Sequence, residues 1–298
     1  MNYHKPVLLN ECIKGLNIKP EGVYVDATFG GGGHSREIIK HLKSGKLFAF
    51  DQDNDAVKNK INHNNFKLIK ANFRYIKNFL KLEGISKIDG LLADLGVSSH
   101  QFDVPERGFT YRSDSQLDMR MNSDSVLDAK EVINSYSEAD LAEVLYRYGD
   151  IGQSRKIAKK IIISREEKYI ETSYDLINVL DGLFSEKYKN KFLSRIFQAI
   201  RIEVNDEINA LKELLNDAVS LLNPNGRLVL ISYHSLEDRL AKNLINKGNI
   251  EGVEQKDFFG KIHKDLNKVN KKVIVPSEEE SMLNSRARSA KLRIAEKK

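Results

Sequence analysis

Short apolar runs recur along the first hundred residues, and an acidic residue directly follows several of them. The three clearest runs, each written with the acid that ends it, are 23–26, 47–51 and 88–94. Helical patterns lie between them, and this alternation predicts an α/β fold built on a parallel sheet. Because the carboxyl ends of parallel strands meet at one edge, we expect Asp26, Asp51 and Asp94 to lie near one another.

A glycine-rich loop, 26–34, joins the first strand to a helix and reads Asp-Ala-Thr-Phe-Gly-Gly-Gly-Gly-His. Glycine lacks a Cβ atom, so the backbone can adopt positive φ and a ligand can lie directly on the amides. Amides at a helix N-terminus favour a carboxylate or phosphate. Asp51, at the end of the next strand, is placed to bind a ribose. The pattern predicts a seat for the adenosine half of a cofactor.

The loop itself narrows the choice of cofactor. It lacks the Gly-Lys-Ser/Thr of a P-loop, and Ser35 stands where a dinucleotide fingerprint has its third glycine. ATP chemistry of the P-loop kind is therefore disfavoured, and NAD is disfavoured but stays open. The two strand-end acids around a glycine loop are the usual layout for S-adenosylmethionine.

Two further strand ends complete this predicted site. After a short helix at 53–61, the strand 66–70 leads to Asn72 and Phe73, which are placed to meet an adenine ring; alternatively Phe73 turns into the core. After the strand 88–94, the loop 95–101 should face the transferable methyl group. Because Asp94 follows a buried run, we interpret it as a site residue.

The middle of the chain predicts a separate helical domain. From residue 102 to 227 the sequence has no comparably apolar strand, so we place a helical insertion at 104–192 between two parts of one methyltransferase-like domain, 1–103 and 193–298. A stripe of apolar positions predicts one long helix over 193–222. A turn then leads to a strand at 227–232, and 271–275 and 290–295 supply the last two of seven strands.

Composition limits the class of protein. The 298 residues are 41% hydrophobic, enough for a large core, and show neither a membrane-spanning run nor a signal peptide, so a cytoplasmic protein without a membrane partner is expected. The single cysteine, Cys12, is better suited to the core than to nucleophilic catalysis. The last 48 residues carry 12 Lys and Arg against 8 Asp and Glu. This excess is compatible with a polyanionic partner or with a merely solvated surface.

Other chemistries find little support. Ser232 to Asp238 contains a Ser/His pair, but no Gly-x-Ser-x-Gly elbow exists, which disfavours a hydrolase. The seven histidines lack paired ligand spacing, so no metal is expected. Arg286 and Arg288 are candidates for phosphate contacts, or belong to a solvated loop.

Seven segments together are more specific than any one pattern. They are residues 4–11, 26–35, 94–99, 106–109, 117–121, 197–205 and 232–239. In these segments the chain resembles, nearly end to end, the bacterial 16S ribosomal RNA cytosine-N4 methyltransferase family. The resemblance implies a class I S-adenosylmethionine-dependent methyltransferase that modifies a cytidine in the decoding region of small-subunit RNA. It also implies these cofactor contacts: Gly32, Gly33, His34, Asp51, Phe73, Asp94 and Gln101. His100 and Ser285 stand where that family usually has proline.

The residues support amine methylation independently. The covalent route to cytosine C5 needs a thiolate at the site, and Cys12 precedes the first strand. An exocyclic amine needs only in-line approach and acceptors for its N–H groups. Asp94 is the candidate acceptor, although the sequence identifies no general base. The candidates for facing the substrate are Ser232, Tyr233, His234, Ser235, Arg286 and Arg288. An RNA-binding ribosome-assembly factor and an NAD-dependent oxidoreductase remain alternatives, and no oligomeric state is predicted.

Overall fold

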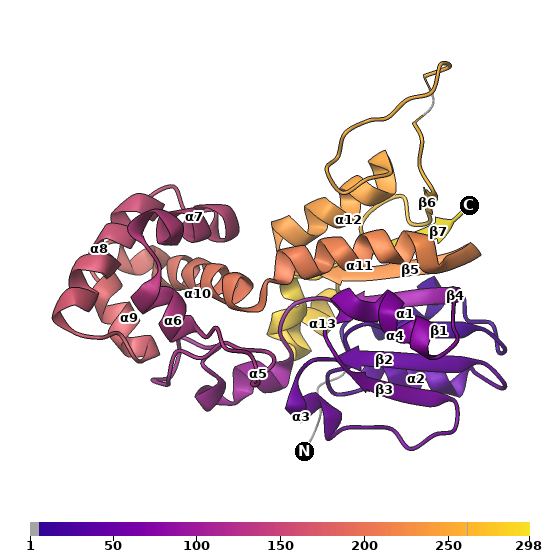
Figure 1. The fold of residues 1–298 in the computed structure, drawn as a ribbon, viewed down its shortest axis with the longest axis horizontal. Helices are drawn as coiled ribbons and strands as arrows, with labels where there is room; N and C mark the ends of the chain where they lie inside the picture. Colours follow the sequence, from indigo (N-terminus) through magenta and orange to yellow (C-terminus); the bar gives the residue numbers. More distant parts are fainter. Residues whose placement is uncertain (1–5, 261) are drawn as a thin grey trace. The chain divides into compact units, whose positions relative to one another are not determined.

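The computed structural model describes residues 6–260 and 262–298, and it contains a seven-stranded sheet of order β3-β2-β1-β4-β5-β7-β6 (Figure 1). The strands are β1 Val23–Asp26, β2 Lys46–Asp51, β3 Phe66–Lys70, β4 Ile88–Asp94, β5 Leu222–Ser232, β6 Leu266–Lys268 and β7 Lys291–Lys297. All neighbours pair in parallel except β7, which runs antiparallel to both β5 and β6. The predicted seven-stranded, mostly parallel α/β fold is confirmed.

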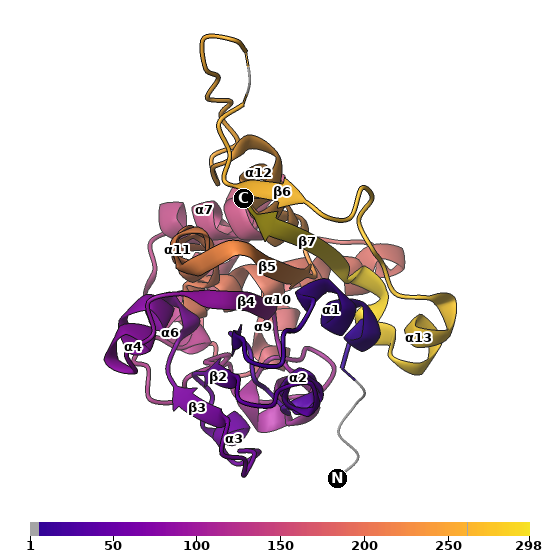
Figure 2. The same cartoon turned by 90° about the vertical axis from the view of Figure 1, so that its right-hand side faces the viewer.

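Helices cover both faces of this sheet, which is why its strands are apolar without alternation (Figure 2). On one face α1 (Leu9–Leu16) and α2 (Gly33–Lys40) pack on Tyr24, Leu47 and Leu92. The opposite face has its own core, which includes residues of three helices: α4 Ile76–Leu82, α11 Glu207–Leu221 and α12 Ser235–Lys247. The short elements of this part are α3 Asn54–Val57, α13 Glu278–Leu283 and the 3-10 turns η1 Phe73–Tyr75 and η4 Ser285–Ser289. Two independent hydrophobic layers therefore hold the strand ends in place.

The chain divides into two compact units, residues 1–96 with 208–298, and residues 97–207. The second unit contains α5 Ser99–Asp103, η2 Pro105–Arg107, α6 Ala129–Ser135, α7 Glu138–Gly149, α8 Ser154–Glu167, α9 Ser173–Leu180, η3 Glu186–Tyr188 and α10 Lys189–Asn205. Its core is separate from the two of the sheet. The expected insertion, 104–192, lies inside this unit, which is wider because Leu193, Ile196 and Ile200 of α10 belong to its core. Among the residues described, no helix has the length and apolarity to cross a membrane.

Four predicted elements differ from the structure, one of them the strand expected at 227–232, which as β5 already begins at Leu222. The single long helix over 193–222 is two helices, α10 and α11, because Asp206 between them takes a left-handed φ of 48°. The helix expected at 53–61 is only the four residues of α3. The segment 271–275 forms no strand and contributes one bridge, Ile274 to Leu292, while the edge strand is β6.

Candidate active site

The acidic residues that end β1, β2 and β4 lie at the carboxyl edge of the sheet, as predicted. Parallel pairing places Asp26 opposite Ala49 of β2 and Asp94 opposite Ile231 of β5. Burial raises the pKa of Asp26, Asp51 and Asp94 to about 6 each, and hydrogen bonds to the carboxylates act in the opposite direction. Such shifted carboxylates are typical of functional sites.

Asp26 is a structural support of this edge. Its carboxylate accepts the backbone N–H of Thr28 at 3.1 Å and the hydroxyl of Ser35 at 2.6 Å. The Thr28 hydroxyl in turn accepts the backbone N–H of Asp94 at 2.7 Å, so it joins the loop after β1 to the end of β4. This role of Thr28 was not predicted, since a threonine in a loop carries no spacing signal of its own.

The glycine loop uses its glycines for different purposes. Gly30 and Gly32 have φ of 51° and 76°, a backbone conformation that residues with a side chain rarely adopt. The Gly30 N–H donates to Asp51 at 2.7 Å, and a Cβ atom on Gly30 would meet only open space. A Cβ atom on Gly33 would lie 2.1 Å from Pro6. Gly30 therefore leaves room for a ligand, whereas Gly33 is required by packing against the protein itself.

His34 and Tyr233 contact Asp94 from two sides. The Tyr233 hydroxyl donates to one carboxylate oxygen of Asp94 at 2.8 Å. His34 Nδ1 lies 4.0 Å from the other oxygen, and its Nε2 lies 3.1 Å from the carbonyl oxygen of Val7. Burial lowers the pKa of His34, so the ring is neutral, and the contact with Val7 places its proton on Nε2. The Asp94 end of β4 is thus surrounded by protein on two sides.

Phe73 and Gln101, which were expected to contact the cofactor, each lie in a well-defined local structure. Phe73 begins η1 immediately after Asn72, whose side chain accepts the backbone N–H of Arg74, and the ring is half-buried against the core. Gln101 is buried in the helical unit, where its side-chain oxygen accepts the backbone N–H of Ser98 at 3.0 Å in a capping box. The contacts of Phe73 and Gln101 with a cofactor stay predictions.

The segment after β5 is fixed by a buried glutamate. Glu237 accepts the backbone N–H of Tyr233 at 2.8 Å and pairs with His234 Nε2 at 3.1 Å. Ser232 is buried and donates to the carbonyl oxygen of Lys291, whereas Ser235 is exposed. The role of Glu237 was not predicted, although His234 and Glu237 have the spacing of a capping box. Of the residues in this segment that were expected to face the substrate, Tyr233 is therefore the one that forms a hydrogen bond with Asp94.

The basic segment near the end of the chain splits into two kinds of residue. Arg286 and Arg288 are exposed in η4, as a phosphate contact requires. Arg293, which follows them in β7, instead forms two hydrogen bonds to Asp238, at 2.7 and 3.1 Å, and Lys291 lies 3.7 Å from the same carboxylate. The guanidinium of Arg293 is therefore committed to an ion pair with Asp238, and the phosphate contacts of Arg286 and Arg288 stay predictions.

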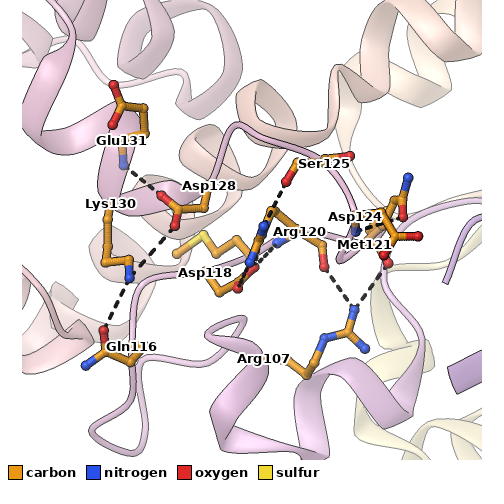
Figure 3. Close-up of polar contacts among 12 residues, drawn as sticks. Arg107, Gln116, Asp118, Arg120, Met121, Asp124, Ser125, Asp128, Lys130 and Glu131 are labelled. Carbon is orange, nitrogen blue, oxygen red and sulfur yellow. Dashed lines mark hydrogen bonds and ion pairs between the residues drawn. The ribbon is translucent and has the colours of Figure 1, made fainter. Parts of the chain in front are cut away.

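Three of the sequence motifs meet inside the helical unit. Figure 3 shows the contacts of two of them, through Arg107, Asp118 and Arg120. Arg107 donates to the carbonyl oxygens of Arg120 and Met121, and Arg120 pairs with Asp118 through two hydrogen bonds of 2.9 and 2.7 Å. Asn205 accepts the backbone N–H of Met121 at 2.7 Å and donates to the carbonyl oxygen of Met119 at 2.8 Å. These contacts fix a loop in which Met119 has a φ of 59°. The motifs at 106–109, 117–121 and 197–205 therefore build one frame.

Comparison with known proteins gives a consistent result. The sequence profile of the MraW methylase family matches residues 1–298. A curated protein of Christiangramia forsetii, "Ribosomal RNA small subunit methyltransferase H", is 54% identical over all of this chain and 98% of its own length; one of Phocaeicola vulgatus with the same name is 52% identical over 99% and 98%.

Among solved structures, an rRNA methylase from Streptococcus thermophilus aligns over 100% of this chain and 98% of its own, with a TM-score of 0.42 and 12% identity. A putative rRNA-methylase from Clostridium thermocellum aligns over 99% of both chains, with a TM-score of 0.46 and 12% identity. Because both TM-scores are below 0.5, these two structures add no support beyond the similarity in sequence to the family.

Proposed function

We propose, from the premise that this chain belongs to the MraW methylase family, that it transfers a methyl group from S-adenosylmethionine to the exocyclic amine of a cytidine in 16S ribosomal RNA. The name shared by the curated relatives supports small-subunit RNA as the substrate. The observation that carries the choice of reaction is the half-buried strand-end carboxylate Asp94, which accepts a hydrogen bond from Tyr233 at the carboxyl edge of the sheet.

The residues present fit the cofactor. The open space beside Gly30 allows a ligand to approach the backbone there, and Asp51 lies next to it with carboxylate oxygens that accept hydrogen bonds from ribose hydroxyls. Phe73, which begins η1 shortly after β3, offers an aromatic surface for adenine. When bound, S-adenosylmethionine supplies a methyl group on a positively charged sulfur, which keeps the bonding electron pair and becomes a neutral thioether.

On the protein side, the reaction requires an acceptor for the proton that the amine loses. The nitrogen forms its new bond with its own lone pair, and one N–H proton leaves afterwards. The Asp94 oxygen that does not bind Tyr233 is suited to accept this N–H and then the proton. Because burial raises the pKa of Asp94 to about 6, the carboxylate is a stronger base than an exposed aspartate and is still ionised at neutral pH.

Cys12 supports nitrogen rather than carbon as the acceptor. Its side chain is fully buried in the core between α1 and the sheet. Burial raises the pKa of the thiol well above its usual value, so little thiolate forms at neutral pH. A covalent attack on cytosine C6, which C5 methylation requires, therefore has no nucleophile in the only cysteine of the sequence.

We assign RNA recognition to the helical insertion, 104–192. It lies inside the helical unit 97–207, which has its own hydrophobic core, and Arg155, Lys156 and Lys159 are exposed on α8. Positive side chains on a rigid helix suit contacts to phosphates, which fix register without reading sequence. Acting on small ribosomal subunits, the protein would work in the cytoplasm.

The test is incubation with labelled S-adenosylmethionine and small subunits that lack the modification, followed by mass spectrometry of the nucleosides. N4-methylcytidine is the expected product. A methyl group on C5 or on a ribose would contradict the reaction. Binding of S-adenosylhomocysteine without any methyl transfer would instead indicate an RNA-binding assembly factor, and binding of nicotinamide would indicate an oxidoreductase.

A further inference from the structure

Tyr233 is held in the site at both its side chain and its backbone. Its hydroxyl donates to Asp94 Oδ1 at 2.8 Å, and its backbone N–H donates to Glu237, whose side chain is 3% exposed. A Cβ atom on Gly96, which has a φ of 92°, would lie 3.4 Å from the ring. The ring is therefore held between the start of α12 and the end of β4, with its hydroxyl aimed at one carboxylate oxygen.

Two neighbours favour the ionised form of Asp94 and so lower its pKa: a positive charge on His34, which has the larger effect, and the hydrogen bond from the Tyr233 hydroxyl. The first is available only while His34 is protonated, and burial lowers the pKa of His34. His34 is neutral and turns its unprotonated Nδ1 toward Oδ2, at 4.0 Å. The titratable groups that surround Asp94 from the packed elements are Asp26 of β1, His34 of α2, Cys12 of α1, Glu237 of α12 and Tyr233 itself. Within the part of the chain that the structure describes, Tyr233 is the side chain that donates a hydrogen bond to the Asp94 carboxylate.

Tyr233 also remains a donor across the pH range in which the protein would work. Burial and the nearby Asp94 carboxylate raise the pKa of Tyr233 well above its usual value of 10. The phenol therefore keeps its proton while Asp94 titrates. A donor that never loses its proton favours the ionised form of its acceptor at every pH.

We propose that Tyr233 is the positioning residue of the methyl transfer: its hydroxyl keeps Asp94 ionised and orients the carboxylate so that Oδ2 accepts an N–H of the substrate amine. The inference rests on the proposed function, since it concerns the step in which the amine loses its proton. No covalent change occurs on Tyr233. The proton passes from the amine nitrogen to Asp94 and from there to solvent.

The test compares Tyr233→Phe with Tyr24→Phe. Tyr24 is a matched control because it is buried in β1 of the same unit and its hydroxyl also makes one hydrogen bond, to the backbone N–H of Lys19 at 2.7 Å. The first measurement is the pH dependence of kcat on the ribosomal substrate. The second is a 13C NMR titration of the Asp94 carboxyl group in the free protein, assigned with Asp94→Asn.

For Tyr233→Phe we expect the acidic limb of the kcat profile to move up by about one pH unit, because the donor that favours the carboxylate is gone. Activity should fall about tenfold on the acidic side and recover toward the wild-type value by about pH 9. The NMR titration of Asp94 should move in the same direction, and Tyr24→Phe should change neither. An equal loss of kcat at every pH, or an unshifted NMR titration, would overturn the inference.

The proposed function and this inference fail in different ways. If the wild-type protein produces no N4-methylcytidine, the reaction is wrong whatever the NMR titration shows. If the wild-type protein produces it and both titrations of Tyr233→Phe match those of Tyr24→Phe, only the role of Tyr233 is rejected.

Discussion

The carboxylate of Asp51 accepts the backbone N–H of Gly30 at 2.7 Å. Its second oxygen accepts the N–H of Asp53 at 2.9 Å, so one side chain at the end of β2 orders both the glycine loop and the entry to α3. A carboxylate offers about four lone-pair positions. Two therefore remain for ligand hydroxyls while the loop stays fixed.

Replacing Asp51 should weaken cofactor binding. We expect Asp51→Asn to lower the affinity for S-adenosylmethionine ~10- to 100-fold, because a hydrogen bond to a charged group contributes roughly 1.5 to 3 kcal/mol. Asp89→Asn is the matched control: Asp89 lies near the start of β4, at the other end of the sheet, and accepts the N–H of Val23. Calorimetry on both variants checks this, and equal affinities in folded proteins would show that Asp51 does not bind the ribose.

Asp26 should make stability fall as pH rises through the mildly acidic range. Burial raises its folded pKa to about 6, against about 3.9 in an unfolded chain, so the folded protein holds the proton more tightly. The loss of folding stability caused by ionising the Asp26 carboxyl group is absent below about pH 4, grows between about pH 4 and 6, and is complete above about pH 6. Between pH 4 and 7 the free energy of unfolding of Asp26→Asn should therefore rise, relative to wild type, by at most about 3 kcal/mol. A pKa difference of about two units between the folded and unfolded states corresponds to that energy. Urea unfolding at several pH values measures it; a difference independent of pH would contradict the assignment.

The frame in the helical unit should depend on Asn205. Asn205→Ala leaves the N–H of Met121 and the carbonyl of Met119 without their side-chain partner, and we expect a loss of about 2 to 3 kcal/mol in the free energy of unfolding. Ser194→Ala, at an exposed position of the same helix, should change it by less than about 0.5 kcal/mol. Urea denaturation followed by circular dichroism compares the two. Similar stabilities would mean that water replaces the side chain of Asn205.

Experiments should distinguish the basic residues that bind RNA, Arg286 and Arg288, from Arg293, which stabilises the fold. Replacing Arg286 and Arg288 with alanine should reduce the slope of log K against log salt for RNA binding by roughly 0.7 per lost phosphate contact. Arg293→Ala should leave that slope unchanged and lower the melting temperature, because Arg293 is paired with Asp238 inside the fold. Filter binding at several salt concentrations, with thermal denaturation alongside, gives both quantities. A smaller slope for Arg293→Ala alone would reverse the assignment.

The strands and their acids were accessible from sequence because burial on both faces requires an unbroken apolar run, and β3 and β4 have the predicted limits. The break between α10 and α11 was not. A single residue in the left-handed region, Asp206, interrupts the helix without disturbing the apolar stripe on either side. No glycine or proline marks the position, so periodicity alone continues across it.

Partners distant in the sequence explain the other differences. The charge pattern could not show that Arg293 meets Asp238, since 55 positions separate them. Asp51 and Asp94 were recognisable because each ends a strand, whereas Thr28 and Glu237 accept the backbone N–H groups of Asp94 and Tyr233, contacts that no sequence spacing indicates. The edge strand β6 has only three residues, Leu266–Lys268, with two of them exposed, so its sequence has no strand pattern.

The pairing of β4 with β5 has a consequence for synthesis on the ribosome. Ala93 and Asp94 pair with Leu230 and Ile231, yet the whole of residues 97–207 is made between the two strands. At bacterial elongation rates this delay is on the order of ten seconds, during which one edge of β4, with its apolar Leu91–Ala93, has no neighbour. An unpaired apolar strand edge recruits other chains. The nascent protein should therefore need a chaperone most in the interval between residue 96 and residue 232.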